Sequence, residues 1–119
     1  METKEIASKL ADYCRRGNWE GAHDELYAKD AESIEPYETP GYKKEVKGIE
    51  AIREKTEKFG NSVEKVNKIE VSETLMAGNS FAFKLTMDLI IKGKGPMIET
   101  ELCVYEVKDG KVIREHFFV

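Results

Sequence analysis

The alternation of apolar and polar residues over 81–91 constrains the fold of this chain more than any other feature. Large apolar side chains occupy every odd position there, while most even positions are small or polar, in the order Phe81-Ala82-Phe83-Lys84-Leu85-Thr86-Met87-Asp88-Leu89-Ile90-Ile91. A repeat of two is typical of a β-strand. Turn residues suited to tight hairpins lie around it at Gly78-Asn79, Gly93-Lys94-Gly95 and Asp109-Gly110. We therefore predict an antiparallel meander of four strands at about 63–76, 80–92, 96–108 and 111–119.

The residues before this meander have helical periodicity. Thr3 is expected to cap a helix over 4–16, and Asn18 to cap a second helix that ends near Lys29. A short extended segment at 33–37 and a loop at 38–47 follow, and a third helix covers 49–59. Helices that precede an antiparallel sheet predict an α+β domain.

Length and charge limit the size of the protein and its partners. A chain of 119 residues is expected to form one domain, 1–119, with room for a core and a modest cavity. The net charge is -4, and no basic cluster exceeds Arg15-Arg16 and Lys43-Lys44. Because binding to nucleic acid requires a basic surface that neutralises phosphates, we expect no nucleic-acid partner.

Neither a membrane segment nor a metal site is expected from the sequence. No apolar stretch approaches the ~18 residues that span a bilayer, and Met1 to Glu5 do not resemble a secretion signal, so we expect a cytoplasmic protein with no membrane partner. Cys14 and Cys103 lie far apart without metal-ligand spacing, which predicts two free thiols and no metal.

The length of the predicted strands indicates a hollow. The strands at 80–92 and 96–108 are about 13 residues long, against about 5 to 6 in typical globular proteins. Long strands in a small domain must curl, and a bent sheet closed by helices leaves a conical space of the kind in which ligands bind. We expect that space to hold a small, partly apolar molecule.

The order of elements, helix, helix, short strand, helix and long meander, resembles the SnoaL-like and ketosteroid-isomerase-like superfamily, which has the fold of nuclear transport factor two. The segments that carry the resemblance are Leu26-Tyr27-Ala28-Lys29-Asp30-Ala31, Ile34-Glu35-Pro36, Gly48-Ile49-Glu50-Ala51-Ile52 and Val104-Tyr105-Glu106-Val107-Lys108-Asp109-Gly110-Lys111-Val112. The resemblance implies a cystatin-like α+β fold, in which a cone-shaped, curved antiparallel sheet is combined with three N-terminal helices.

The resemblance also implies a range of functions, because the superfamily includes isomerases, cyclases, dehydratases, hydrolases and non-catalytic binding modules. Glu35, directly before Pro36, is similar to the general base of ketosteroid isomerase. That enzyme's two hydrogen-bond donors are a tyrosine, expected near Ala11 with Tyr13 the nearest here, and an aspartate, expected near Cys103.

Pairing the strands through their turns predicts the two faces of the sheet. With Gly93-Lys94 and Asp109-Gly110 as two-residue loops, Asp88 pairs with Glu99, and Cys103 lies between Lys84 and His116. One face then carries Lys84, Thr86, Asp88, Glu99, Glu101, Cys103, Tyr105 and His116, and the other carries Phe81, Phe83, Leu85, Met87, Leu89, Ile98, Leu102, Val104 and Phe117.

Two assignments of these faces compete. If the mixed face is concave, its carboxylates and His116 line the hollow, and the apolar face is convex and covered by a second subunit in a homodimer. If the apolar face is concave, the hollow is a core and the charged face is solvated. A single β-bulge would reverse part of the register.

The first assignment predicts an acid/base site that uses neither a metal nor an organic cofactor. Glu35 or His116 would move a proton, while Glu101 and Asp88 would position or polarise the substrate. Tyr13, Trp19 and Phe59 would form an apolar wall, and Lys84, Cys103 and Tyr105 would contact the ligand. Such a protein would be an isomerase, cyclase or lyase; the alternative is a non-catalytic ligand-binding or dimerisation module.

Overall fold

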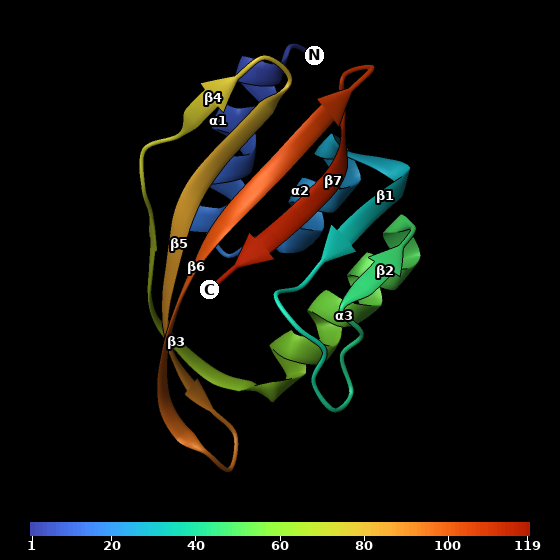
Figure 1. Cartoon of the computed structure of the whole chain (residues 1–119). Coiled ribbons are helices and arrows are strands. Elements are labelled where there is room, and N and C mark those ends of the chain that lie inside the picture. The colour runs from blue at the N-terminus through green and yellow to red at the C-terminus, as the bar shows by residue number, and fades with distance from the viewer.

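In a computed structural model that describes residues 1–119, three helices pack against one curved sheet (Figure 1). The elements in chain order are α1 Thr3–Arg15, α2 Trp19–Leu26, β1 Tyr27–Ile34, β2 Glu45–Lys47, α3 Ile49–Ser62, β3 Val63–Val71, β4 Leu75–Ala77, β5 Ser80–Ile91, β6 Gly95–Lys108 and β7 Lys111–Phe118. The α+β class and the three helices are confirmed. No helix is both long and apolar enough to cross a membrane.

The first two helices form where the periodicity predicts them. Gly17, with a φ of 66°, allows the left-handed turn between α1 and α2. The Asn18 side chain then caps α2 by accepting a hydrogen bond of 2.9 Å from the Gly21 backbone N–H. The predicted cap at Thr3 is wrong, because Glu2 is the N-cap and Thr3 is already the first helical residue.

Helix α2 ends at Leu26, three residues before the predicted end, because β1 starts at Tyr27. Residues of β1 pair in parallel with β7, as in Tyr27 with Val112 and Ser33 with Glu115. The sheet is therefore mixed, and not antiparallel throughout. The predicted loop at 38–47 also contains a short strand, β2, which pairs with the end of β1. Long-range strand pairing overrides the local helical pattern here.

The predicted meander is confirmed, since β3 pairs with β5, β5 with β6 and β6 with β7, all antiparallel, in the sheet order β2-β1-β7-β6-β5-β3. The predicted strand 63–76 is two strands, β3 and β4, and both pair with β5. At the break between them, the Ser72 hydroxyl accepts a hydrogen bond of 2.8 Å from the Lys84 backbone N–H.

The predicted register between β5 and β6 is wrong by one residue. Ile91 pairs with Gly95, so the loop is Lys92-Gly93-Lys94, with three residues and not two. Asp88 therefore pairs with Ile98, Leu85 with Glu101 and Phe83 with Cys103. A shift of one residue moves a strand's side chains to the opposite face. Each predicted face thus combined residues that lie on opposite faces.

A β-bulge changes the register again between β6 and β7. Val107 pairs with Val112 but Glu106 pairs with Arg114, which leaves Ile113 as the extra residue. Beyond the bulge Val104 lies opposite His116, and Glu115 is buried. The predicted pairing of Cys103 with His116 is therefore wrong, and Cys103 pairs with Phe117.

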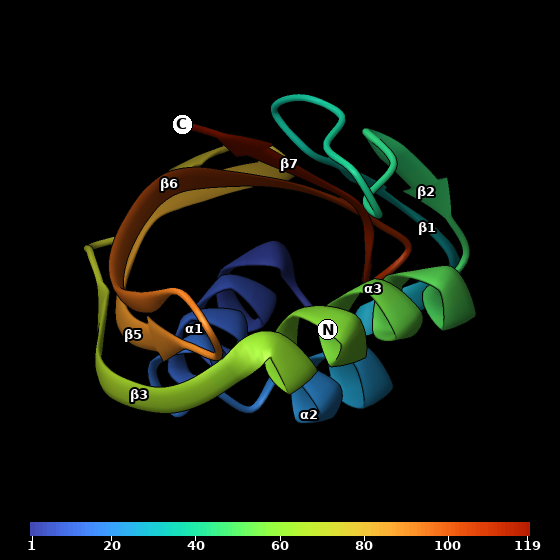
Figure 2. The ribbon, with the colours of Figure 1, turned by 90° about the horizontal axis from the view of Figure 1, so that it is seen from below.

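Curvature of the sheet creates the interior of the molecule. Figure 2 shows the sheet bending around the helices without closing into a full barrel. The odd residues of β5 are buried against the helices, from Phe81 to Ile91, together with Cys103, Tyr105 and Val107 of β6. The concave face thus combines the apolar residues of β5 with the odd residues of β6, and these include Glu99 and Glu101.

Candidate functional site

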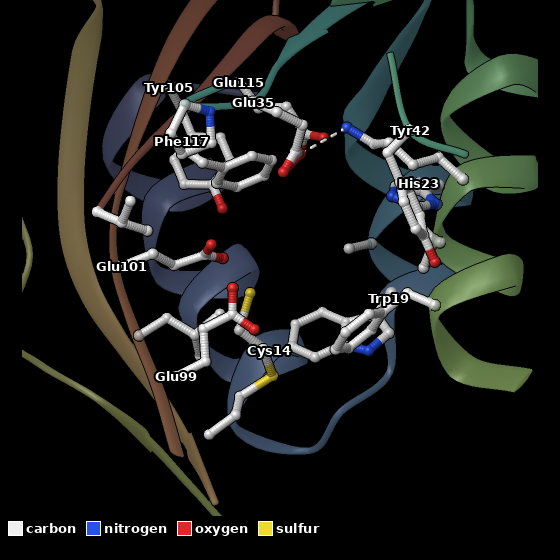
Figure 3. A pocket seen from close by; sticks show the side chains of 18 of the residues that line it. Cys14, Trp19, His23, Glu35, Tyr42, Glu99, Glu101, Tyr105, Glu115 and Phe117 are labelled. Carbon is white, nitrogen blue, oxygen red and sulfur yellow. Dashed lines mark hydrogen bonds and ion pairs between the residues drawn. The ribbon is translucent and has the colours of Figure 1, made fainter. Parts of the chain in front are cut away.

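A cavity of about 280 Å³ lies between the concave face of the sheet and the helices. Its wall is formed by α1, α2, β1 and the segment after it, α3 and the three strands β5, β6 and β7. Figure 3 shows Glu99 and Glu101 pointing into this space from one side, with Trp19, His23 and Tyr42 on the opposite side. The cavity is thus acidic on one wall and largely aromatic on the other.

Half of the ten residues predicted for the site line this cavity. They are Glu35, Glu101, Trp19, Phe59 and Tyr105. The other five, His116, Asp88, Lys84, Cys103 and Tyr13, are not part of its wall.

The register explains why three of these residues lie elsewhere. Lys84 and Asp88 are even residues of β5, on the face opposite the buried odd residues, and Asp88 accepts a hydrogen bond of 3.3 Å from Asn67. The bulge in β7 turns His116 to this outer face, where its ring stacks on Phe118 with 4.1 Å between centroids. None of these three residues lies in the cavity, where its predicted role requires it to be.

Tyr13 and Cys103 are absent from the cavity wall for different reasons. The Tyr13 hydroxyl is turned away to α2, where it donates a hydrogen bond of 2.5 Å to Glu25. Cys103 is completely buried behind the wall, with its sulfur 3.9 Å from a carboxyl oxygen of Glu101. Both cysteines are free, as the sequence predicts, and burial raises the pKa of the Cys14 thiol to about 12.

Glu99 and Glu101 form the acidic wall. They are two residues apart on β6, so both side chains point into the cavity. Burial, together with the nearby carboxylates of Glu99 and Glu35, raises the pKa of Glu101 to about 8. Burial and Glu35 also raise the pKa of Glu99. Neither group belongs to any of the salt bridges in the structure, and with a pKa of about 8 Glu101 is mainly a neutral carboxylic acid at pH 7.

A chain of polar side chains lies at the end of the cavity where Figure 3 labels Glu35 and Glu115. The Lys55 ammonium donates hydrogen bonds to Glu35 Oε2 at 2.9 Å and to Ser33 Oγ at 2.5 Å. Ser33 Oγ donates to Glu115 Oε2 at 2.6 Å, and the Tyr27 hydroxyl donates to Glu115 Oε1. The ion pair between Lys55 and Glu35 is largely shielded, since their side chains are 13% and 26% exposed. Shielding of this kind strengthens the pairing relative to a surface ion pair.

His23 supplies a neutral imidazole to the opposite wall. Burial, with a smaller contribution from the Arg53 cation, lowers its pKa to about 4. Its ring meets that of Tyr27 edge-on, with 4.9 Å between centroids. At neutral pH the imidazole therefore adds no positive charge to the cavity.

The segment after β1 contributes aromatic residues to the mouth of the cavity. Tyr37 and Tyr42 both line it. Lys58 on α3 holds this segment, because its ammonium donates a hydrogen bond of 2.5 Å to the Gly41 carbonyl and lies 4.7 Å from the centre of the Tyr42 ring. Together with Trp19 and Phe59, these rings can enclose a flat apolar ligand.

Sequence reasoning missed Lys55, Glu115, Tyr27 and His23 in the cavity wall, and Ser33 buried behind it. A signal for Lys55 was present, since it is three residues after Ile52 and four before Phe59, on the apolar side of the third helix. Glu115 gave no such signal, because it points inward only as a result of the bulge in β7.

Nowhere in the structure do three or more histidine, cysteine or acidic side chains form a group that could hold a metal ion. The lining of the cavity contains a neutral acid, Glu101, and an ion-paired carboxylate, Glu35. Two carboxyl groups in different protonation states can donate and accept a proton in the same reaction.

Comparisons with known proteins agree with this architecture. One similar structure is that of a protein from Mesorhizobium loti, described as a candidate SnoaL-like polyketide cyclase and also as a carbohydrate phosphatase. It is 28% identical to this chain, with a TM-score of 0.90, and the match covers 100% of both chains. A Catenulispora acidiphila protein with a ketosteroid-isomerase-like fold, in complex with trimethylamine, is 16% identical, with a TM-score of 0.75 over 97% of this chain and 85% of that one. An NTF2-like protein of unknown function from Burkholderia pseudomallei is 11% identical, with a TM-score of 0.80 over 98% and 88%.

No match is found among curated proteins. The family model described as SnoaL-like domain, however, matches residues 1–119, which is the whole chain. The predicted resemblance is confirmed, and this chain belongs to the SnoaL-like domain family.

Proposed function

We propose that the cavity binds a small, partly apolar molecule and catalyses a proton transfer on it without a cofactor. The observation that supports this most directly is that two carboxyl groups in different environments line the same cavity. Glu101 has a pKa raised to about 8, and Glu35 is bound to the Lys55 ammonium. An isomerase, cyclase or lyase that works by general acid/base catalysis uses one group that removes a proton and one that supplies it.

In the proposed reaction, the Glu35 carboxylate removes a proton from carbon, and the C–H electron pair moves toward a neighbouring oxygen of the substrate. Glu101, in its neutral form, donates a hydrogen bond or its proton to that oxygen as negative charge develops. A donor in a shielded cavity stabilises such a charge far more than water does. Trp19 and Phe59 contact the apolar body of the ligand.

A carbon acid of simple chemistry tests this proposal. The ring of 5-nitrobenzisoxazole opens when a base removes its C–H proton, and the coloured nitrophenolate product is measured by absorbance. We expect turnover above the buffer rate that falls at least a hundredfold in Glu35→Gln, since one general base contributes about 10²- to 10⁴-fold. His116→Ala and Asp88→Asn, which change residues outside the cavity wall, are the matched controls.

Equal rates for wild type and Glu35→Gln would refute the role of Glu35. The pH profile tests Glu101 separately, because the neutral form is the proposed donor. Turnover is expected to decline as the pH rises through about 8, where Glu101 loses its proton. A rate that continues to rise above that pH would remove Glu101 from the mechanism.

The second candidate is a binding module without catalysis. It is favoured by the ion pair of Glu35 with Lys55, because the ammonium already occupies Glu35 Oε2, one of the two oxygens that would take the proton. Trp19, the only tryptophan in the chain, lines the cavity and reports binding in either case. Quenching of its fluorescence by 4-nitroacetophenone, an uncharged aromatic ketone, combined with no turnover of 5-nitrobenzisoxazole, would support this second candidate.

We also propose that the convex face mediates a homodimer. Ile98, Leu102 and Phe118 are 71%, 45% and 43% exposed on β6 and β7, and Leu102 lies directly opposite Phe118. Exposed apolar patches of this kind commonly mark interfaces. Sedimentation velocity should give a dimer that Leu102→Lys converts to a monomer; a monomeric wild type at micromolar concentration would contradict the proposal.

A further inference from the structure

Glu115 is a buried carboxyl group that the proposed proton transfer does not use. It is only 5% exposed, and the sheet turns it inward through the bulge at Ile113. A carboxylate in the interior costs free energy, and an apolar side chain of similar size would often be as stable or more stable. Bulges commonly re-aim a side chain next to a functional site. A role for this carboxylate beyond packing would explain both features.

Both oxygens of Glu115 accept hydrogen bonds from hydroxyl groups. Tyr27 donates to Oε1, and Ser33 donates to Oε2 at 2.6 Å. Burial and the nearby Glu35 carboxylate raise the pKa of Glu115, while these two donors and the Lys55 cation act in the opposite direction. With both oxygens engaged, Glu115 is held in one orientation.

The Ser33 hydroxyl connects Glu115 to Lys55. A hydroxyl has one proton, and since this proton is directed to Glu115, the oxygen lone pairs of Ser33 are available to accept from Lys55 Nζ at 2.5 Å. Lys55 Nζ also donates to Glu35 Oε2 at 2.9 Å. The direction of donation is therefore fixed from Lys55 through Ser33 to Glu115.

We propose that Glu115 is a positioning residue: through Ser33 it fixes the Lys55 ammonium, and Lys55 in turn fixes the Glu35 carboxylate in the cavity wall. This inference rests on the proposed function, because it takes Glu35 as the base. A glutamine at 115 has an acceptor oxygen at only one of the two carboxylate positions and a donating N–H₂ group at the other, so it cannot accept from Tyr27 at one position and from Ser33 at the other. The Ser33 or the Tyr27 hydroxyl must then reorient, which weakens the hold of Glu115 on Lys55 and Glu35.

A double-mutant cycle tests whether Glu115 acts through Lys55. We expect Ser33→Ala and Glu115→Gln each to lower kcat for 5-nitrobenzisoxazole about tenfold or more, with little change in KM, because a misplaced base loses alignment. In a Lys55→Met background neither substitution is expected to change kcat further. The same fold-change in both backgrounds would overturn the inference. Ser8→Ala, on the exposed face of α1, is the control.

A second readout does not depend on turnover. The exchange of the Lys55 Nζ protons with water, measured by ¹⁵N NMR, is expected to accelerate about tenfold in Ser33→Ala and Glu115→Gln, because each variant weakens the hydrogen bonds that hold the ammonium. Unchanged exchange in both variants would refute the chain. If wild type does not turn over 5-nitrobenzisoxazole, the proposed base fails, while this measurement still decides whether Glu115 positions Lys55. Urea denaturation identifies a variant that loses its fold, and the other variant then carries the test.

Discussion

Replacing Glu101 by glutamine is expected to change how the stability of the protein depends on pH. Glu101 is neutral in the folded state up to about pH 8, because burial and the neighbouring carboxylates raise its pKa from 4.5. In the unfolded chain the same group ionises near its ordinary pKa. Glutamine has nearly the same shape and does not titrate, so the comparison isolates the proton on Glu101.

The sign and size of the effect follow from proton linkage. Between pH 4.5 and about 8, the folded state binds one proton at Glu101 that the unfolded state has lost, so this group makes the wild type less stable as the pH rises. The stability that Glu101 contributes is fully present below its pKa in the unfolded chain. It is lost once the pH has risen through its pKa in the folded state. Each pH unit corresponds to about 1.4 kcal/mol, or about 4 kcal/mol from pH 5 to pH 8. Solvent in the cavity shields the group in part, so we expect roughly 2–4 kcal/mol.

Urea denaturation of both proteins at pH 5, 6, 7 and 8 provides the assay. The difference in unfolding free energy, Glu101→Gln minus wild type, is expected to grow steadily across this range. A difference that stays constant within about 0.5 kcal/mol, the usual limit for surface changes, would refute the reasoning. Glu70→Gln, in an exposed side chain of β3 paired with Lys68, controls for removing one negative charge.

Three further predictions concern packing, capping and thiol chemistry. Phe83, 1% exposed and with its ring 5.4 Å from that of Tyr105, fills the concave face, so Phe83→Ala is expected to lower the unfolding free energy in urea. The loss is about 3–5 kcal/mol, and one below about 1 kcal/mol would contradict this packing. Asn18→Ala removes the side-chain cap of α2 and is expected to cost about 1 kcal/mol in the same assay, whereas no change would mean that the cap contributes nothing. Because burial raises the pKa of Cys14 to about 12 and also raises that of Cys103, both thiols should react with a disulfide reagent at pH 8 about a thousandfold more slowly than a free thiol, and rapid labelling of the native protein would contradict their burial.

The sequence predicted a cavity but only part of its wall. Glu35, Trp19 and Phe59 are in the wall because they lie on segments whose position depends on helix periodicity and on Pro36. The structure therefore has these three residues where the local sequence pattern predicted them. His116 was placed by counting residues through the turn at Asp109-Gly110, and one bulge in β7 was enough to move it off the face that carries Glu101.

The pattern of residues by itself determined the class of the fold, the three helices, the meander and its curvature. These features follow from local periodicity and strand length, which act over a few residues. Tertiary structure alone decided the parallel pairing of β1 with β7, which ends α2 at Leu26, and the inward turn of Glu115. The physical reason is that strand register depends on the number of residues in loops and bulges. A change of one residue costs little locally, yet it exchanges the side chains that face the cavity with those that face outward.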